Sequence, residues 1–310
     1  MDGKILKISI LLLALAVLCT AASAANSDRL KVATTSSLQD TKLLDLIHEK
    51  YLEKYNVSAD VTTAGGTGIA IAAGEKGNVD VLLIHDKDRE QKFIKDGHGL
   101  ERRCIAYNYF NIVGPADDPA GIKGLNSSQA LKAILEKGKA DPAKVKFVSR
   151  GDGSGTHAKE QRIWKAAGFN YTTEINTSAN KDWYLDVGSP MGETLQKASE
   201  KSAYTLTDLS TFKAYQGNLT LVPLIEGGAD LLNVYVAIAV NPKTHPGVNC
   251  VMANQFIDYL VSDEGQQLIA DFGKEKYDQP LFFPAKGNCE LIGCSSVECA
   301  VPTNASCAAA

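Results

Sequence analysis

The chain has 310 residues and is weakly acidic, because 36 acidic residues outnumber 32 basic ones and give a formal net charge of −4. A protein with this balance has no broad basic face, which argues against nucleic acid or anionic lipid as its ligand. The length exceeds the usual size of a single hydrophobic core, so we expect two domains.

The first 24 residues are typical of a secretory signal peptide. Lys4 and Lys7 make a basic start, the run 8–17 is apolar, and Ala22-Ser23-Ala24 has the small residues of a cleavage site. The apolar run is shorter than the roughly 18 residues of a membrane span, and no later run reaches that length. We therefore expect a chain that is secreted to the cell surface or a periplasm after cleavage, with an uncleaved N-terminal anchor as the alternative.

Short apolar strands alternate with helices through the first half of the chain. The patterning predicts strands over 30–34, 57–61, 79–84 and 104–113, and helices near 43–51, 69–74 and 87–95. The continuous apolar run 79–84 is typical of a parallel strand that is buried on both faces. This alternation favours an α/β architecture, in which ligands bind at the carboxyl ends of strands.

The second half of the chain continues the same pattern. It predicts strands over 146–149, 204–206 and 234–240, a loop over 182–194, and helices near 128–136, 252–260 and 264–272. A further helix opens at about Thr156, directly after a glycine-rich segment.

Three strand-to-helix turns combine hydroxyl side chains with glycines, at 34–37, 65–68 and 150–156. Each turn offers backbone N–H groups and hydroxyl donors at the positive end of a helix, and Arg150 adds a planar cation. One such turn is usually no more than a helix cap. Three of them indicate a site for a tetrahedral oxyanion, which needs about six to eight donors to replace its water.

Features outside these turns indicate an extracellular protein. Six cysteines remain once Cys19 leaves with the signal peptide, and an even number outside the cell is typical of disulfides. Their spacing leaves the pairing open, and it lacks the close pairs and the nearby histidine of a zinc site. Six sequons indicate a glycoprotein, at Asn56, Asn126, Asn170, Asn176, Asn218 and Asn304.

The chain resembles the extracellular tungstate-binding proteins of ABC importers over nearly all of residues 29–285. The segments 34–37 and 150–157 carry the most specific part of this resemblance, and 80–85, 117–122 and 204–208 extend it. The related molybdate-binding proteins are similar as well. The resemblance implies an α/β fold of two lobes, the type II periplasmic-binding-protein fold, with two mixed sheets flanked by helices and two crossing strands as a hinge, near 109–114 and 233–236.

The resemblance also implies how the chain is divided. We expect a signal peptide over 1–24, a first lobe from 25–110 and 235–286, and a second lobe from 111–234. Residues 287–310 would form a cysteine-containing C-terminal tail that the family does not share.

The resemblance assigns the ligand-binding residues position by position. They are Thr35, Ser36, Ser37, Thr67, Arg150, Ser154, Gly155 and Thr156, with Thr34, Gly66 and Thr205 as weaker candidates. Asp152 would repel an oxyanion that carries no proton, so we expect it to turn away and to cap the helix or orient Arg150. His85 and Asp86 alone are too few for a metal site, so we interpret them as an ordinary loop and expect no metal.

The function that the resemblance implies is that of a solute-binding component of an ABC importer. Such a protein would capture tungstate between its lobes as a monomer, without a cofactor, and deliver it to the membrane permease. The alternatives are the same fold with molybdate, phosphate or sulfate as ligand, a surface enzyme, or a sensory module. An enzyme needs a nucleophile with its base or a cluster of metal ligands, and the sequence offers neither pattern.

Overall fold

The computed structural model describes residues 29–302 and Cys307, so the predicted signal peptide and the sequon at Asn304 lie outside the described residues. The described elements form an α/β fold with one mixed sheet of eight strands and a parallel sheet of two strands. Along the part of the chain that is described, no helix is long and apolar enough to cross a membrane.

One group of strands forms the larger part of the mixed sheet, in the order β10-β4-β9-β3-β1-β2. Its strands are β1 (Arg29–Thr35), β2 (Ser58–Gly65), β3 (Val81–Ile84), β4 (Gly99–Gly114), β9 (Leu232–Val240) and β10 (Phe283–Pro284). β1 pairs in parallel with both β2 and β3, whereas β9 pairs antiparallel with β3 and β4.

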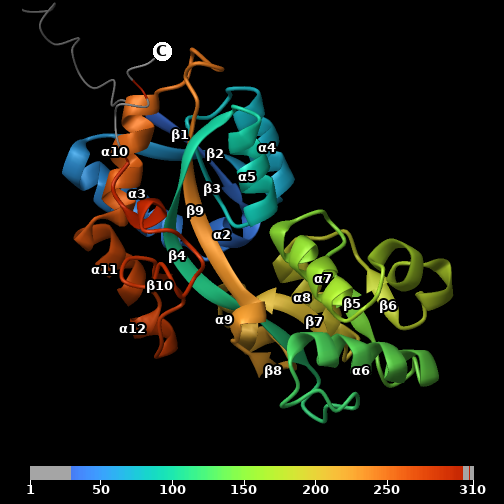
Figure 1. Cartoon of the computed structure of the whole chain (residues 1–310). Helices are drawn as coiled ribbons and strands as arrows, with labels where there is room; N and C mark the ends of the chain where they lie inside the picture. Colours follow the sequence, from blue (N-terminus) through green and yellow to red (C-terminus); the bar gives the residue numbers. More distant parts are fainter. Residues whose placement is uncertain (1–28, 303–306, 308–310) are drawn as a thin grey trace, which may run out of the picture.

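Helices cover both faces of this part of the sheet (Figure 1). They are α2 (Ser36–Asp40), α3 (Leu43–Tyr55), α4 (Thr67–Glu75), α5 (Lys87–Lys95), α10 (Cys250–Val261), α11 (Asp263–Asp271) and α12 (Lys274–Tyr277). Two buried apolar clusters hold them in place, one with Ile47, Phe256 and Ile269 and the other with Ile71 and Phe93. The burial of these apolar side chains is the main stabilising contribution.

The second group of elements surrounds the far end of β4. Its strands are β5 (Phe147–Ser149), β6 (Tyr184–Asp186), β7 (Thr205–Asp208) and β8 (Val222–Glu226), and its helices are α6 (Ser127–Ala140), α7 (Gly155–Ala166), α8 (Met191–Glu200) and α9 (Leu209–Tyr215). Short helical turns complete it, at Tyr171–Ile175, Ser178–Asn180, Gln216–Asn218 and Ala229–Leu231. Trp164, Trp183 and Tyr184 lie at the centre of its own apolar cluster.

The long strand β4 connects the two groups, as Figure 1 shows. Its first part pairs with β9, and its last residues pair with β7 and β8. The predicted α/β fold is therefore confirmed, but the prediction of two separate mixed sheets is wrong. One eight-stranded sheet runs through both groups because they share the 16 residues of β4, and the separate sheet β5-β6 is small and parallel.

Several helices and two of the short strands agree with the patterning. The predicted helices 87–95, 252–260 and 264–272 correspond to α5, α10 and α11, and the predicted strands 146–149 and 204–206 correspond to β5 and β7. The predicted loop over 182–194 instead contains β6 and the start of α8, and β8 was not predicted. β6 has three residues without a clear alternation, and it forms through its pairing with β5.

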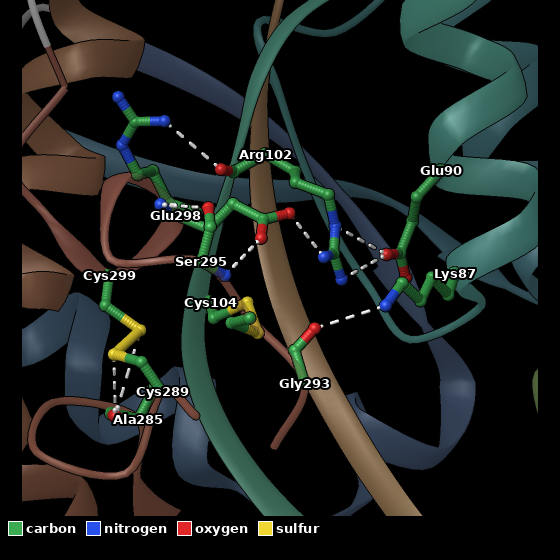
Figure 2. Close-up of a disulfide and its surroundings, with 12 residues drawn as sticks. Lys87, Glu90, Arg102, Cys104, Ala285, Cys289, Gly293, Ser295, Glu298 and Cys299 are labelled. Carbon is green, nitrogen blue, oxygen red and sulfur yellow. Dashed lines mark hydrogen bonds and ion pairs between the residues drawn. A yellow bond between two sulfur atoms is a disulfide. The ribbon is translucent and has the colours of Figure 1, made fainter. Parts of the chain in front are cut away.

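The segment after β10 is fixed to β4 by covalent and ionic contacts, as Figure 2 shows. Cys294 forms a disulfide with Cys104 of β4, and two further disulfides join Cys289 to Cys299 and Cys250 to Cys307. Arg102 of β4 lies between Glu90 of α5 and Glu298 of this segment, with 3.0 Å from Nη2 to the Glu90 carboxylate. The prediction of disulfides is confirmed, and the structure supplies the pairing that the sequence left open.

Candidate oxyanion-binding site

The first two turns lie side by side because their strands are neighbours. β1 and β2 pair in parallel with Thr35 opposite Gly65, so the turns that follow these two residues leave the same edge of the sheet. Thr35 caps α2, and its Oγ1 accepts the Leu38 N–H at 3.4 Å and lies 3.3 Å from Ser37 Oγ. Ser36 is half-buried at the first position of α2.

Thr34 uses its hydroxyl within the sheet. Its Oγ1 donates to the carbonyl oxygen of Leu83 in β3 at 3.0 Å. A hydroxyl has one proton to donate, so this bond leaves Thr34 without a donor for a ligand. This contact weakens Thr34 further as a candidate and leaves Thr35, Ser36 and Ser37 in the first turn.

The third turn follows β5 and meets the second turn directly. Gly66 packs against the backbone of Ser154, and a Cβ at Gly66 would lie 3.6 Å from Ser154 Cα. Ser154 caps α7, with its Oγ accepting the His157 N–H at 3.2 Å. A Cβ at Gly155 would lie 3.2 Å from Thr67 Oγ1, so the starts of α4 and α7 are in contact. The structure therefore brings all three predicted turns together.

Arg150 is buried at the entrance to the third turn, with 3% of its surface exposed. The backbone that follows needs glycine, since Gly151 has a φ of +61° and a Cβ there would lie 1.5 Å from Asp186 Oδ1. Asp152 pairs with Arg150 Nη2 through one carboxylate oxygen and accepts the Ser154 N–H at 3.1 Å through the other. Asp152 thus orients Arg150, as the sequence analysis expected.

Four polar atoms of the proposed ligand residues are buried and unsatisfied. Within the described part of the chain, no hydrogen-bond partner exists for Thr67 Oγ1, Arg150 Nε, Thr156 Oγ1 or Thr205 Oγ1. Buried polar groups in native proteins almost always have a partner, and each one without a partner costs about 1–3 kcal/mol. Thr205 begins β7, which neighbours β5 through the pairing of Tyr204 with Phe147. The four donors fit a ligand that accepts hydrogen bonds from several sides.

Glu160 supports the third turn from behind. Its carboxylate is fully buried and accepts from Ser149 Oγ at 2.6 Å, Tyr184 OH at 2.6 Å and Trp164 Nε1 at 3.1 Å. Burial raises the pKa of Glu160 to about 7, against the lowering effect of these hydrogen bonds. The network ties the end of β5 to α7 and so fixes the position of Arg150 between them.

A hydrogen bond and two ion pairs join the two groups of elements beside the site. Arg89 of α5 donates from Nη1 to the Gly153 carbonyl oxygen at 2.7 Å. Arg162 of α7 pairs with Asp86 and, at 3.2 Å, with Asp88. These residues lie on opposite groups, so the contacts close the structure over the three turns.

His85 lies beside this site, although its sequence pattern indicated an ordinary loop. His85 follows β3 at the same sheet edge, is 8% exposed, and has no hydrogen-bond partner for either ring nitrogen among the residues that the structure describes. A Cβ at Gly155 would lie 2.8 Å from His85 Cε1 and 3.0 Å from Nδ1. A polar residue directly after a buried parallel strand was the available signal, because ligands bind where such strands end.

A cavity of about 210 Å³ lies on the other side of His85 and Gly155. Lys159 of α7 lines it, with Nζ donating to the Leu232 carbonyl oxygen at 3.2 Å and lying over the Phe110 ring. Burial, together with the nearby Arg162, lowers the pKa of Lys159 to about 8. Ile292 of the disulfide-linked C-terminal segment also lines this cavity.

The fold and the site define a class of protein. Residues 20–264 match the model of the PBP superfamily domain, so the chain belongs to this superfamily of binding proteins. It is a binding protein of the transporter type.

Relatives identify the family within this class. The chain is 39% identical over 256 residues to the tungstate-binding protein TupA of Peptoclostridium acidaminophilum. This alignment covers 82% of this chain and 84% of the relative. It is 43% identical to a protein whose structure is described as the tungstate ABC transporter from Geobacter sulfurreducens, with a TM-score of 0.68 over 79% of this chain and 98% of that one. TupA from Desulfovibrio alaskensis G20 is 38% identical, with a TM-score of 0.68 over 83% and 98% of the two chains. The chain belongs to the TupA family of tungstate-binding proteins.

Proposed function

We propose that this chain binds tungstate where its three turns meet and delivers it to the permease of an ABC importer. The observation that carries this proposal is the set of buried donors without partners, Thr67 Oγ1, Thr156 Oγ1, Thr205 Oγ1 and Arg150 Nε. A tetrahedral dianion would satisfy these donors at once, together with N–H groups at the starts of α4 and α7. The names of the relatives support tungstate as the ligand.

The contacts of Asp152 favour an oxyanion that carries no proton. A protonated phosphate needs an acceptor for its O–H group, and each carboxylate oxygen of Asp152 already accepts one hydrogen bond, from Arg150 or from Ser154, which leaves fewer lone pairs for the ligand. Tungstate and molybdate have no proton at neutral pH and need donors alone. We therefore propose a preference for tungstate or molybdate over phosphate.

We further propose that the two groups of elements are two lobes of a type II periplasmic-binding-protein fold that close on the ligand. The segments 109–114 of β4 and 233–236 of β9 would act as the hinge. The first lobe would consist of residues 25–110 and 235–286, and the second lobe of residues 111–234. Arg89–Gly153 and Arg162–Asp86 are contacts that closure would form. Three disulfides support a location outside the cell.

Calorimetric titration of the mature chain tests this function. Tungstate, molybdate, phosphate and sulfate are compared in one buffer that contains none of them. We expect tight binding of tungstate and at least a hundredfold weaker binding of phosphate. A preference for phosphate would contradict the role given to Asp152, and no binding of any oxyanion at micromolar concentrations would contradict the function.

A further inference from the structure

His85 is a titratable side chain enclosed where the two groups of elements meet. It follows β3 on one side, and α7 of the other group begins against its ring. The Tyr235 ring packs on it with centroids 4.9 Å apart, and the Phe110 ring lies at 6.4 Å. A neutral imidazole has one donor and one acceptor, and neither ring nitrogen of His85 has a hydrogen-bond partner among the described residues.

Asn233 of β9 lines the same cavity as His85 and offers an acceptor to its ring. Its Nδ2 donates to Asn108 Oδ1 and Tyr235 OH, each at 2.9 Å, which sets the orientation of the amide. Its Oδ1 is then an acceptor that is buried and, among the described residues, unpartnered. An imidazole N–H beside it would satisfy this oxygen, and the other ring nitrogen would then hold a lone pair.

The Cε1–Nδ1 edge of His85 lies against the start of α7, in the third turn of the proposed oxyanion site. A Cβ at Gly155 would lie 3.0 Å from His85 Nδ1 and 3.2 Å from Thr67 Oγ1, so the ring and this hydroxyl meet at one point of α7. Thr67 Oγ1 is itself buried and without a partner within the described chain. A lone pair at Nδ1 would repel an oxyanion there, whereas an N–H would bind it.

We propose that His85 is a proton-linked ligand of the oxyanion, with Nε2–H donating to Asn233 Oδ1 and Nδ1 taking up a proton from solvent as the dianion enters. The protonated Nδ1–H then donates to an oxygen of the dianion. This inference rests on the proposed function and adds to it the coupling of oxyanion capture to proton uptake. It also gives the site a second positive charge that is present only when the ligand is bound.

The charged groups around the His85 ring determine its pKa. Burial lowers the pKa of His85 to about 4, so the ring is neutral at pH 7 when no anion is present. Asp208 and Asp86 raise this pKa and Arg150 lowers it. Asp208 is held by Ser210, Thr211 and the start of α9, and Asp86 is paired with Arg162 and Arg89.

Other charged groups face the ring from the adjacent cavity. They are Lys87, Glu90, Arg102, Lys159 and Arg162, and Glu90 pairs with Arg102. A dianion beside Nδ1 brings two negative charges into this enclosed region and raises the pKa of His85. Affinity then increases as pH falls below the pKa of the bound state, by up to about tenfold per pH unit.

Calorimetry in pairs of buffers measures the proton directly. Tungstate is titrated at several pH values between 6.5 and 8, in two buffers that differ in ionisation enthalpy, and the difference in heat gives the number of protons taken up. We expect uptake that approaches one proton towards pH 6.5. His85→Asn keeps a side-chain N–H but cannot be protonated, so it should bind tungstate more weakly and with no proton uptake.

His98→Asn is the matched control. His98 lies away from the site, with Nδ1 3.0 Å from His245 Nε2, so this variant should keep the wild-type affinity and uptake. Wild-type binding without proton uptake, or unchanged uptake in His85→Asn, overturns the inference and leaves tungstate binding intact. Absence of tungstate binding by the wild type would overturn the proposed function as well.

A second measurement reads protonation in the wild-type protein and uses a variant only for assignment. The ¹⁵N resonances of the histidine rings in the wild-type protein report protonation of each imidazole. Tungstate should shift one ring from the neutral to the protonated pattern at pH 7, with His85→Gln serving to assign it. Five histidines that keep their protonation state on saturation with tungstate would overturn the inference.

Discussion

Replacement of Arg150 is the most direct test of the proposed site. Arg150→Ala removes a cation that is 3% exposed and that begins the third turn, and it also leaves Asp152 without its arginine partner. Truncation of one member of a buried charge pair costs about 2–5 kcal/mol. This corresponds to a Kd for tungstate that is roughly 30- to 5,000-fold higher.

Arg150→Lys separates charge from geometry. Lysine keeps the positive charge but has neither the Nε donor nor the planar fork that pairs with Asp152, so we expect an intermediate loss, about tenfold to a hundredfold in Kd. Titration calorimetry gives the Kd values, and circular dichroism checks the fold. A similar affinity of Arg150→Ala and the wild type would refute the placement of Arg150 in the site.

The control for both variants is an arginine outside the site. Arg29 is 73% exposed and pairs with Asp60 at the start of β1. Arg29→Ala should bind tungstate with the wild-type Kd, because an exposed pair contributes little. An equal loss in this variant would mean that the effect of Arg150→Ala comes from net charge rather than from contact with the ligand.

Four further predictions follow from the same contacts. Tungstate at 100 times its Kd should stabilise the native state by about 2.7 kcal/mol and raise Tm by roughly 4–5 °C in a thermal melt; no shift would contradict binding in a site that forms on folding. Gly155→Ala should abolish this shift, because its Cβ would lie 2.8 Å from His85, and a normal shift would show that α7 does not close on the ligand there. Cys104→Ser with Cys294→Ser should lower the free energy of unfolding by about 2–5 kcal/mol in denaturant titration, with tungstate binding kept under native conditions. Glu160 has a native pKa of about 7, raised by burial from 4.5, so the native state holds its proton more tightly than the unfolded state and stability decreases as pH rises from 4.5 to 7. Unfolding of Glu160→Gln should show a smaller decrease over that range, and an unchanged pH profile would contradict the buried environment of Glu160.

The sequence by itself determined the local parts of the site. Hydroxyls and glycines at 34–37, 65–68 and 150–156 predict turns with free N–H groups, since caps and left-handed glycines depend on neighbours within a few residues. The role of Asp152 could be predicted in the same way. Its negative charge has to be turned away from an anion, and Arg150 is close enough in the chain to pair with it. The α/β alternation and the helices α5, α10 and α11 also depend on local periodicity.

Tertiary structure decided which of these groups meet and which are already used. Thr34 and Thr35 are alike in the sequence, but the sheet directs Thr34 Oγ1 to Leu83 of β3. Thr67 and Gly155 come into contact only because two groups of elements close on each other. Hydrogen-bond partners, disulfide pairing and the enclosure of His85 depend on segments far apart in the chain, and local patterning carries no information about them. Burial then turns an ordinary loop histidine into a group whose protonation depends on what binds beside it.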